Sequence, residues 1–499
     1  MSNKKLENEL TELKIDLDDV SRNMVDEFFN ELNKRINLPF VAKEQLINDY
    51  LKAFRYYLNN NYKVKKIVKL LDLNNLGDFY AHNERRYLEL DNAAIVYPLG
   101  MRQHEMPMFR LGVKLKEVVC PELLQIALDI TIKRFPGFVC TVKSGFFWHY
   151  LETNNNPIQI EEEKDIPCKP ISRLSRTYRS FRVLYYKKRI SIEFFHVLTD
   201  GTGGLVFLKT LLREYFNLKG IKVPIEKGIL DINGIVNEEE LENEFKKAKG
   251  DSDFNTFVDH SSLQLKGKRI NAPMSKIVHF ILETDKLKEV SKKYSGTITA
   301  YICAIMFLAA KPCIKQKEGL FNIQIPINMR KFNNSKTLKN YSMYFNASVD
   351  IKNVHDKETL VKEISKQIKE KGSYESMHKM MVTTGKIINS LSFVPKFLKN
   401  IVLQLVYGSF ANSMIGSTLS NVGLVDMPEE MKKEIDMVYF LLSPGYPNRA
   451  SATMASINNK TLFTVIKNSD DDTFENNIYD LLKEDGLKVE LEGSIDYES

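Results

Sequence analysis

The chain has 499 residues, of which 43% are hydrophobic and 27% are charged, and this composition excludes a disordered or fibrous protein. At this length we expect two or three domains, because single hydrophobic cores stop growing at roughly 250–300 residues. The net charge of +7 comes from 71 basic and 64 acidic residues without a compact basic block, so we expect no nucleic-acid partner.

The cysteines and the N-terminus bear on location. The five cysteines are scattered singly without a Cys-x-x-Cys pair, so the sequence predicts neither a metal site nor a disulfide framework. The charged N-terminus, Met1–Glu9, is followed by no apolar segment, so we expect no signal peptide. The longest apolar run, Ala300–Ala310, is about half of the roughly 20 residues that a membrane-spanning helix needs. We therefore expect a soluble, cytoplasmic protein.

Residues 1–84 have the pattern of a helical N-terminal extension. Apolar side chains recur at intervals of three and four residues around Phe28 and again around Phe54. No titratable groups cluster among these aromatic residues as they would in a reactive site. The aromatic stripes are therefore predicted to be packing surfaces.

A mixed α and β pattern begins near residue 85. The expected elements are strands over 108–115, 139–142, 146–151 and 181–186, a helix over 121–135, and a strand–turn–helix unit over 189–216. After Tyr215 the periodicity is lost for roughly 60 residues, and this polar crossover is the predicted boundary between a first half, 85–265, and a second half, 266–499. The acidic run Glu238–Glu240 within it is predicted to be a solvated helix face.

The second half repeats this alternation. We expect strands over 275–282, 320–328, 418–422, 437–442, 450–457 and 461–466, and helices over 285–294, 299–311 and 356–371. Both halves have strands wrapped by helices, which predicts the α/β fold class.

One stretch, Arg189–Gly204, combines a strand, a histidine and a glycine-rich turn. Apolar residues alternate from Ile190 to Phe194, and a period of two places His196 on the same face at the end of the strand. The pKa of histidine lies near neutrality, so beside a cavity this side chain could take a proton from a hydroxyl, thiol or amine. Asp200 could orient the turn through the backbone or through a basic side chain elsewhere. The alternative is a buried structural histidine followed by an ordinary turn.

The hexapeptide His196-Val197-Leu198-Thr199-Asp200-Gly201 resembles the HxxxDG motif of the CoA-dependent acyltransferases. This superfamily includes chloramphenicol acetyltransferase, nonribosomal peptide condensation domains, wax ester synthases and alcohol acetyltransferases. Further segments that resemble the family follow in its order, namely LDNAAIVYP at 90–98, RFPGF at 134–138, IPINMR at 325–330 and LSNVG at 419–423. The sequence is most similar to the alcohol acetyltransferase-like branch. Phe195 stands where condensation domains usually carry a first histidine, and the DFGWG segment of the plant enzymes is absent.

The resemblance implies two chloramphenicol-acetyltransferase-like mixed-sheet subdomains that meet at a central tunnel. His196 would deprotonate an acceptor that attacks the CoA thioester directly, in a motif completed by Asp200 and Gly201. Asp200 would pair with an arginine, for which Arg330 is the candidate, and the alternative for Arg330 is an ordinary surface or loop arginine. Ser420 and Asn421 are candidates for stabilising the oxyanion or lining the tunnel, and the alternative for both is an ordinary polar residue of a strand or turn.

The implied co-substrate is acyl-CoA or acyl-phosphopantetheine, with a small hydroxyl or amine acceptor, no permanently bound cofactor and no metal. One alternative is a condensation-type ester or amide synthase that uses an acyl carrier protein as donor. A second is a non-catalytic binding module of the same fold. The apolar and basic stretch Phe393–Leu403 could contact a membrane surface and admit lipophilic acceptors, or it could be a helix that covers the tunnel.

Overall fold

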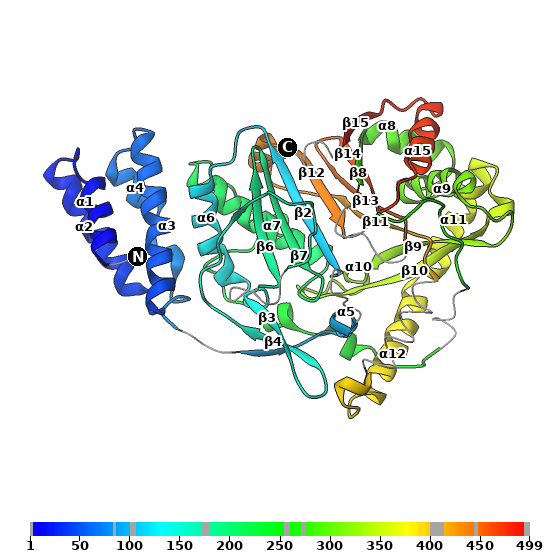
Figure 1. Ribbon diagram of the computed structural model, residues 1–499, viewed down its shortest axis with the longest axis horizontal. Helices are drawn as coiled ribbons and strands as arrows, with labels where there is room; N and C mark the ends of the chain where they lie inside the picture. The colour runs from blue at the N-terminus through cyan, green and yellow to red at the C-terminus, as the bar shows by residue number, and fades with distance from the viewer. Residues whose placement is uncertain are drawn as a thin grey trace.

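The computed structural model describes residues 3–82, 86–99, 106–171, 179–253, 260–270, 276–399, 414–443 and 448–493. A group of N-terminal helices lies at one end of the molecule, and two units of sheets and helices follow it (Figure 1). The predicted α/β class is confirmed.

The N-terminal extension is helical, as expected. Its elements are α1 (Asn3–Leu13), α2 (Asp19–Arg35), α3 (Phe40–Asn59), α4 (Val64–Leu70) and the 3₁₀ helix η1 (Leu73–Leu76). Phe28, Phe29 and Phe54 are buried in contact with one another, so the aromatic stripe is packing surface. The Tyr57 hydroxyl donates a hydrogen bond of 2.6 Å to the Leu218 carbonyl, which ties the extension to the rest of the chain.

A five-stranded sheet carries the histidine stretch. Its strand order is β12 (Ile435–Leu442), β2 (Met108–Leu115), β7 (Arg189–Phe195), β6 (Phe181–Tyr186) and β5 (Glu161–Glu162). The central strand β7 pairs antiparallel with β2 and β6, and all of its residues are buried. The helices α6 (Pro121–Thr131) and α7 (Gly201–Leu218) lie beside this sheet, and η2 (Ile132–Arg134) continues α6 (Figure 1).

A small antiparallel sheet lies at the edge of the same unit. It consists of β1 (Tyr87–Glu89), β4 (His149–Thr153) and β3 (Cys140–Ser144), in that order. The short helix α5 (Val96–Leu99) follows β1, and the 3₁₀ helices η3 (Glu238–Leu241) and η4 (Glu244–Lys247) lie in the long polar crossover.

A seven-stranded mixed sheet forms the second unit. Its strand order is β10 (Ser342–Asp350), β9 (Leu320–Asn328), β11 (Ser417–Leu424), β13 (Ala450–Ile457), β14 (Lys460–Lys467), β8 (Lys276–Glu283) and β15 (Glu490–Gly493). Its helices are α8 (Thr284–Lys293), α9 (Ile298–Ala310), η6 (Lys311–Cys313), α10 (Arg330–Asn333), η7 (Ile351–Asn353), α11 (Lys357–Lys371), α12 (Tyr374–Ser390), α14 (Glu429–Glu434) and α15 (Thr473–Glu484). Helix α9 is almost entirely buried.

The second half of the sequence contributes one strand to the five-stranded sheet. β12 belongs to the second half of the sequence, yet it pairs antiparallel with β2 at the edge of the five-stranded sheet, with Val438 opposite Val113. The boundary near residue 265 therefore stays a prediction about the sequence, and it does not separate the two sheets.

The acidic run differs from the expectation. Glu240 is buried, and Arg134 donates two hydrogen bonds of 2.7 and 2.8 Å to its carboxylate. The neighbouring Glu239 is exposed, as predicted for the whole run. A buried arginine supplies the counter-charge that makes burial of the Glu240 carboxylate tolerable.

Among the described residues, no single helix is long and apolar enough to span a membrane, and only the pair α8 and α9–η6, bent by 76°, meets the length and composition required. The same residues contain no group of three or more His, Cys, Asp or Glu side chains arranged to hold a metal ion.

Candidate active site

The histidine stretch folds as strand, turn and helix. Strand β7 ends at Phe195, so His196 is the first residue of the turn, and its backbone NH donates to the Pro107 carbonyl at 2.9 Å. Asp200 is the N-cap of α7, and its Oδ1 accepts hydrogen bonds of 3.1 Å from the NH groups of Thr202 and Gly203. The cap satisfies two of the helix's free donors and fixes where the turn ends.

Two aromatic rings pack against the His196 imidazole. The ring centroid of Tyr97 lies 4.8 Å away and that of Phe109 lies 5.0 Å away, the latter edge-on. His196 itself is partly buried. Burial lowers the pKa of His196 below its ordinary value, although the Asp200 charge and a hydrogen bond to Asn340 act in the opposite direction. Burial therefore favours the neutral imidazole, which is the state a general base requires.

Asn340 and Asp91 form a polar chain behind this ring. His196 Nδ1 lies 2.9 Å from Asn340 Oδ1. Asn340 donates to Asp91 Oδ2 from both its side-chain Nδ2, at 3.0 Å, and its backbone NH, at 3.2 Å. The other oxygen of Asp91 accepts from the Ala94 NH at 2.7 Å. Burial raises the pKa of Asp91 to about 6, and the three donated hydrogen bonds favour its ionised form.

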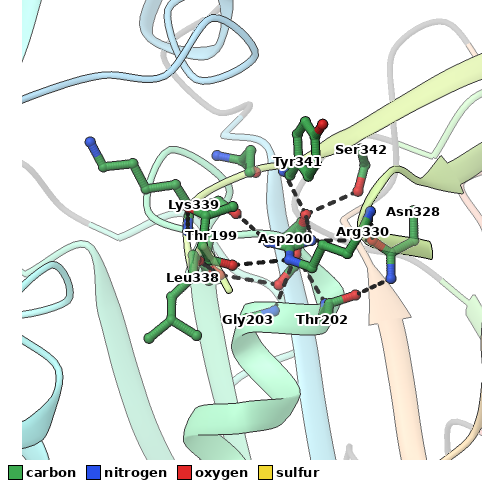
Figure 2. A network of polar contacts seen from close by, with 12 residues as sticks. Thr199, Asp200, Thr202, Gly203, Asn328, Arg330, Leu338, Lys339, Tyr341 and Ser342 are labelled. Atoms are coloured by element: carbon green, nitrogen blue, oxygen red, sulfur yellow. Dashed lines mark hydrogen bonds and ion pairs between the residues drawn. The ribbon is translucent and has the colours of Figure 1, made fainter. Parts of the chain in front are cut away.

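Asp200 and Arg330 form a buried ion pair. Arg330 Nη1 lies 2.8 Å from Asp200 Oδ2, which also accepts from the Tyr341 NH at 2.8 Å and the Ser342 hydroxyl at 3.0 Å (Figure 2). Burial alone would raise the pKa of Asp200, but Arg330 and these hydrogen bonds hold it below its ordinary value. The structure thus brings together the two residues that the resemblance paired.

Arg330 also organises the loop that faces the turn. Its Nε donates to the Thr337 carbonyl at 2.9 Å and its Nη2 to the Lys339 carbonyl at 2.6 Å. From this loop the Leu338 carbonyl accepts a hydrogen bond of 2.6 Å from the Thr199 hydroxyl. Several hydrogen bonds therefore hold segment 328–342 against the turn of residues 196–203.

Two glycines allow the close approach of these segments. A Cβ at Gly203 would overlap the Leu338 carbonyl and the Thr199 hydroxyl, so only glycine fits beside segment 328–342 at this position. A Cβ at Gly201 would lie 3.3 Å from Val422 Cγ1, because the end of β11 packs directly against the first residue of α7. Gly201 thus marks where the LSNVG segment meets the HxxxDG turn.

The two oxyanion candidates differ in their surroundings. The Asn421 amide is engaged at both ends, since Nδ2 donates to Thr299 Oγ1 at 3.0 Å and Oδ1 accepts from the Gly423 NH at 2.8 Å. Ser420 is partly buried, and strand alternation puts it on the opposite face of β11 from Asn421.

The Arg134–Glu240 pair is connected to segment 328–342 by hydrogen bonds. The Glu240 carbonyl accepts a hydrogen bond of 2.8 Å from the Leu338 NH, and the Thr337 hydroxyl donates to the Glu242 carbonyl at 2.7 Å. The RFPGF segment is thereby linked to the loop that holds His196 and Asp200.

Sequence reasoning missed Asn340, Asp91 and Glu240. Asp91 lies within the segment 90–98 that resembles the family, which was a usable signal. Asn340 lies in a loop without periodicity, and only the fold shows that it contacts a residue 144 positions earlier.

Part of the sequence matches a known protein family. Residues 252–483 match the sequence model of the alcohol acetyltransferase family. The resemblance to CoA-dependent acyltransferases is confirmed, and the match supports an acyltransferase. No curated protein matches the chain.

Solved structures show the same fold at low identity. TRI3 trichothecene 15-O-acetyltransferase from Fusarium sporotrichioides has a TM-score of 0.55 at 12% identity, over 80% of this chain and 94% of that one. The epimerization domain of tyrocidine synthetase B has a TM-score of 0.53 at 10% identity, over 81% and 95%. F. sporotrichioides TRI101, in complex with coenzyme A and T-2, has a TM-score of 0.52 at 9% identity, over 81% and 99%. The chain therefore has the fold shared by chloramphenicol acetyltransferase and condensation domains.

Proposed function

We propose that this protein transfers an acyl group from a CoA thioester to a small hydroxyl or amine acceptor, with His196 as the general base. The observation that carries the proposal is the His196 ring, packed against Tyr97 and Phe109 with Nδ1 engaged by Asn340. This arrangement leaves Nε2 to act on a substrate. The family match of the second half and the CoA complex of a protein with the same fold support the choice of donor.

In the proposed reaction, His196 Nε2 takes the acceptor's proton while the acceptor oxygen or nitrogen attacks the thioester carbonyl. The tetrahedral oxyanion then collapses, the C–S bond breaks, and the imidazolium returns its proton to the departing thiolate. No acyl-enzyme forms. Of the two oxyanion candidates we favour Ser420, because the Asn421 amide already has partners at both ends. Each oxyanion donor typically contributes about 10²–10³-fold.

Asp200 and Arg330 have a positioning role in this proposal. The Asp200 carboxylate is committed to a helix cap, two backbone or side-chain donors and an arginine, so it holds the turn in place and takes no proton from substrate. Gly201 contributes by letting β11 approach the turn.

A donor and acceptor screen tests the function. Acyl-CoAs of graded chain length are combined with alcohols and amines, and free thiol is measured with and without acceptor. We expect acceptor-dependent thiol release with at least one donor. The same assay with acyl-phosphopantetheine on a carrier protein distinguishes a condensation-type synthase. Release from neither donor class in a folded protein would indicate a non-catalytic module.

A further inference from the structure

The first inference deepens the proposed function and rests on it. We propose that Asn340 and Asp91 are positioning residues that hold the His196 imidazole in the tautomer with the proton on Nδ1. The pair is deeply buried, with Asn340 2% and Asp91 1% exposed, so its hydrogen bonds do not compete with water.

The direction of each hydrogen bond follows from Asp91. An ionised carboxylate only accepts, so the Asn340 amide must turn its NH₂ toward Asp91 Oδ2. The backbone NH of Asn340 donates to the same oxygen and fixes the residue at two points. The amide oxygen therefore faces His196, and Nδ1 must be the donor across the 2.9 Å contact.

The tautomer determines which ring nitrogen of His196 can accept a proton. With the proton fixed on Nδ1, Nε2 keeps its lone pair and is the nitrogen that can accept a proton. When His196 becomes an imidazolium, the hydrogen bond from Nδ1 to Asn340 turns into a charge-assisted one, which is shorter and stronger. Asp200, whose charge also reaches the ring, is tied to Arg330 and does not contact Nδ1.

Nitrogen NMR of the imidazole tests this inference independently of activity. The signals of His196 are assigned by comparison with His196→Gln, and the tautomer is read from the ¹⁵N shifts above the pKa of the ring. We expect the Nδ1–H form in the wild type and a mixture of tautomers in Asn340→Ala and Asp91→Ala. A matched control is Asn333→Ala, which removes the hydrogen bond that Asn333 Nδ2 donates to the Tyr341 hydroxyl in the same segment and leaves the contacts of the His196 ring in place.

Kinetics give a second readout. Asn340→Ala should lower kcat by about 10- to 100-fold with little change in KM. Asn340→Asp should move the acid limb of the pH profile to higher pH, because a carboxylate beside Nδ1 favours the imidazolium. An Nε2–H tautomer in the wild type, or an unchanged tautomer and kcat in Asn340→Ala, would overturn the inference. If the wild type transfers no acyl group at all, the proposed function fails, and the NMR result still decides the tautomer.

A second inference rests on a different part of the molecule. We infer that an exposed aromatic patch at the β3–β4 hairpin and the segment after α12 docks on an anionic phospholipid membrane. The patch consists of Phe146, Phe147, Phe393, Phe397 and Leu398, whose exposed fractions run from 39% to 87%. The hairpin tip and the end of α12 lie side by side at the lower edge of Figure 1.

Direct contacts join the two segments. The Lys396 NH donates to the Phe146 carbonyl at 3.0 Å, and Lys399 Nζ donates to the Phe147 carbonyl at 3.0 Å. The Lys399 ammonium also lies over the Trp148 ring, 3.1 Å from its centroid. The patch is therefore a single surface built from two distant parts of the sequence.

The charge around the patch selects the partner. Residues 143–151 and 386–399 contain four lysines and no aspartate or glutamate. Lys386 and Lys396 reach solvent, whereas Lys399 is buried and Lys143 pairs with Glu152 at 3.8 Å, so the first two carry the positive charge beside the patch. Aromatic side chains partition into the membrane interface, and nearby lysines are attracted to anionic headgroups. Burying several exposed aromatic rings together is a stronger attraction than any one ring provides.

Trp148 is the only tryptophan of the chain and reports on the patch directly. We expect its emission to shift to shorter wavelength, and the protein to sediment, with phosphatidylcholine–phosphatidylserine vesicles more than with phosphatidylcholine alone, and less at high salt. The double variant Phe393→Ser/Phe397→Ser should bind about tenfold more weakly or worse. The control Phe40→Ser/Val41→Ser removes comparably exposed apolar side chains from α3 and should bind normally.

Three outcomes would overturn this second inference. One is the absence of a shift and of sedimentation with either vesicle. Another is an equal loss of binding in the α3 control. The third is a Trp148 shift that depends on protein concentration without vesicles and disappears in the patch variant, which would assign the surface to a second copy of the chain.

Discussion

Asp200 does two jobs with its two oxygens. Oδ1 caps α7, whereas Oδ2 binds Arg330 and two donors of the facing loop. Removing the carboxylate leaves a buried guanidinium without its counter-charge, so we expect Asp200→Asn to lower the free energy of unfolding by about 3–5 kcal/mol in urea titrations. The control Asp356→Asn weakens the N-cap of α11 at an exposed aspartate and should cost much less. Equal losses in the two variants would contradict the ion-pair role.

The same pair gives a pH dependence of stability. The pKa of Asp200 is lower in the folded protein than in the unfolded chain, so its stabilisation is present above the ordinary carboxyl pKa and is lost as the pH falls through the folded value. The gap in stability between wild type and Asp200→Asn should therefore narrow below about pH 4. Thermal unfolding at a series of pH values measures this gap, and a gap that stays constant on acidification would refute it.

The low pKa of His196 predicts the acid limb of catalysis. Burial disfavours the imidazolium, so the neutral base persists to lower pH than in a free histidine. The kcat/KM profile should rise to its plateau with a midpoint below about 6.5. A midpoint above that value would mean that a nearby carboxylate, and not burial, dominates the surroundings of the ring.

Glu239 and Glu240 are neighbours in η3 with opposite environments. Glu240 is buried against Arg134, whereas Glu239 pairs at the surface with Lys336 at 3.4 Å. We expect Glu240→Gln to lower the free energy of unfolding by about 3–5 kcal/mol and Glu239→Gln to change it little. Loss of the pair should also loosen the loop at Leu338, which hydrogen exchange of residues 337–340 would detect. If Glu240→Gln lowered the free energy of unfolding only slightly, segment 328–342 would keep its position without the Arg134–Glu240 pair.

Helices α3 and α6 bury two aspartates at their interface. Burial raises the pKa of Asp49 to about 7 and raises that of Asp129, which the Asp49 charge raises further. Because these values are higher in the folded state, stability should fall as the pH rises from about 4 to 7. We expect the Tm of Asp49→Asn to fall less than that of the wild type between pH 5 and 8, with exposed Asp19→Asn as control. Parallel Tm curves for all three proteins would contradict this.

Helices and strands were predicted correctly where apolar residues recur with a single period along the segment. β6, β7, β9 and the α7 region were expected from alternation or helical spacing. β10 was missed even though Met343, Phe345 and Ala347 alternate as buried residues, because polar and aromatic side chains are interleaved with them. The acidic run was misassigned because composition does not reveal that Arg134 is buried opposite one of its three carboxylates.

The candidate site is assembled from segments far apart in the sequence. Four segments meet at this site, namely Asp91, the turn at 196–203, the loop at 328–342 and β11. The two halves of the sequence are also joined by the pairing of β12 with β2. Motif spacing located the base and its turn, and family resemblance suggested Arg330. The Asn340–Asp91 chain lay beyond sequence reasoning, because hydrogen bonds between residues 249 positions apart depend on the complete fold.

The most direct measurement is acyl transfer by His196→Ala, followed as acceptor-dependent thiol release beside the wild type. Positioned base catalysis contributes about 10²–10⁴-fold, so we expect a loss of at least that order with thioester binding retained. His82→Ala, which removes a side chain 70% exposed, should be as active as the wild type. Turnover by folded His196→Ala within a few-fold of the wild type would contradict the assignment of His196 as the base.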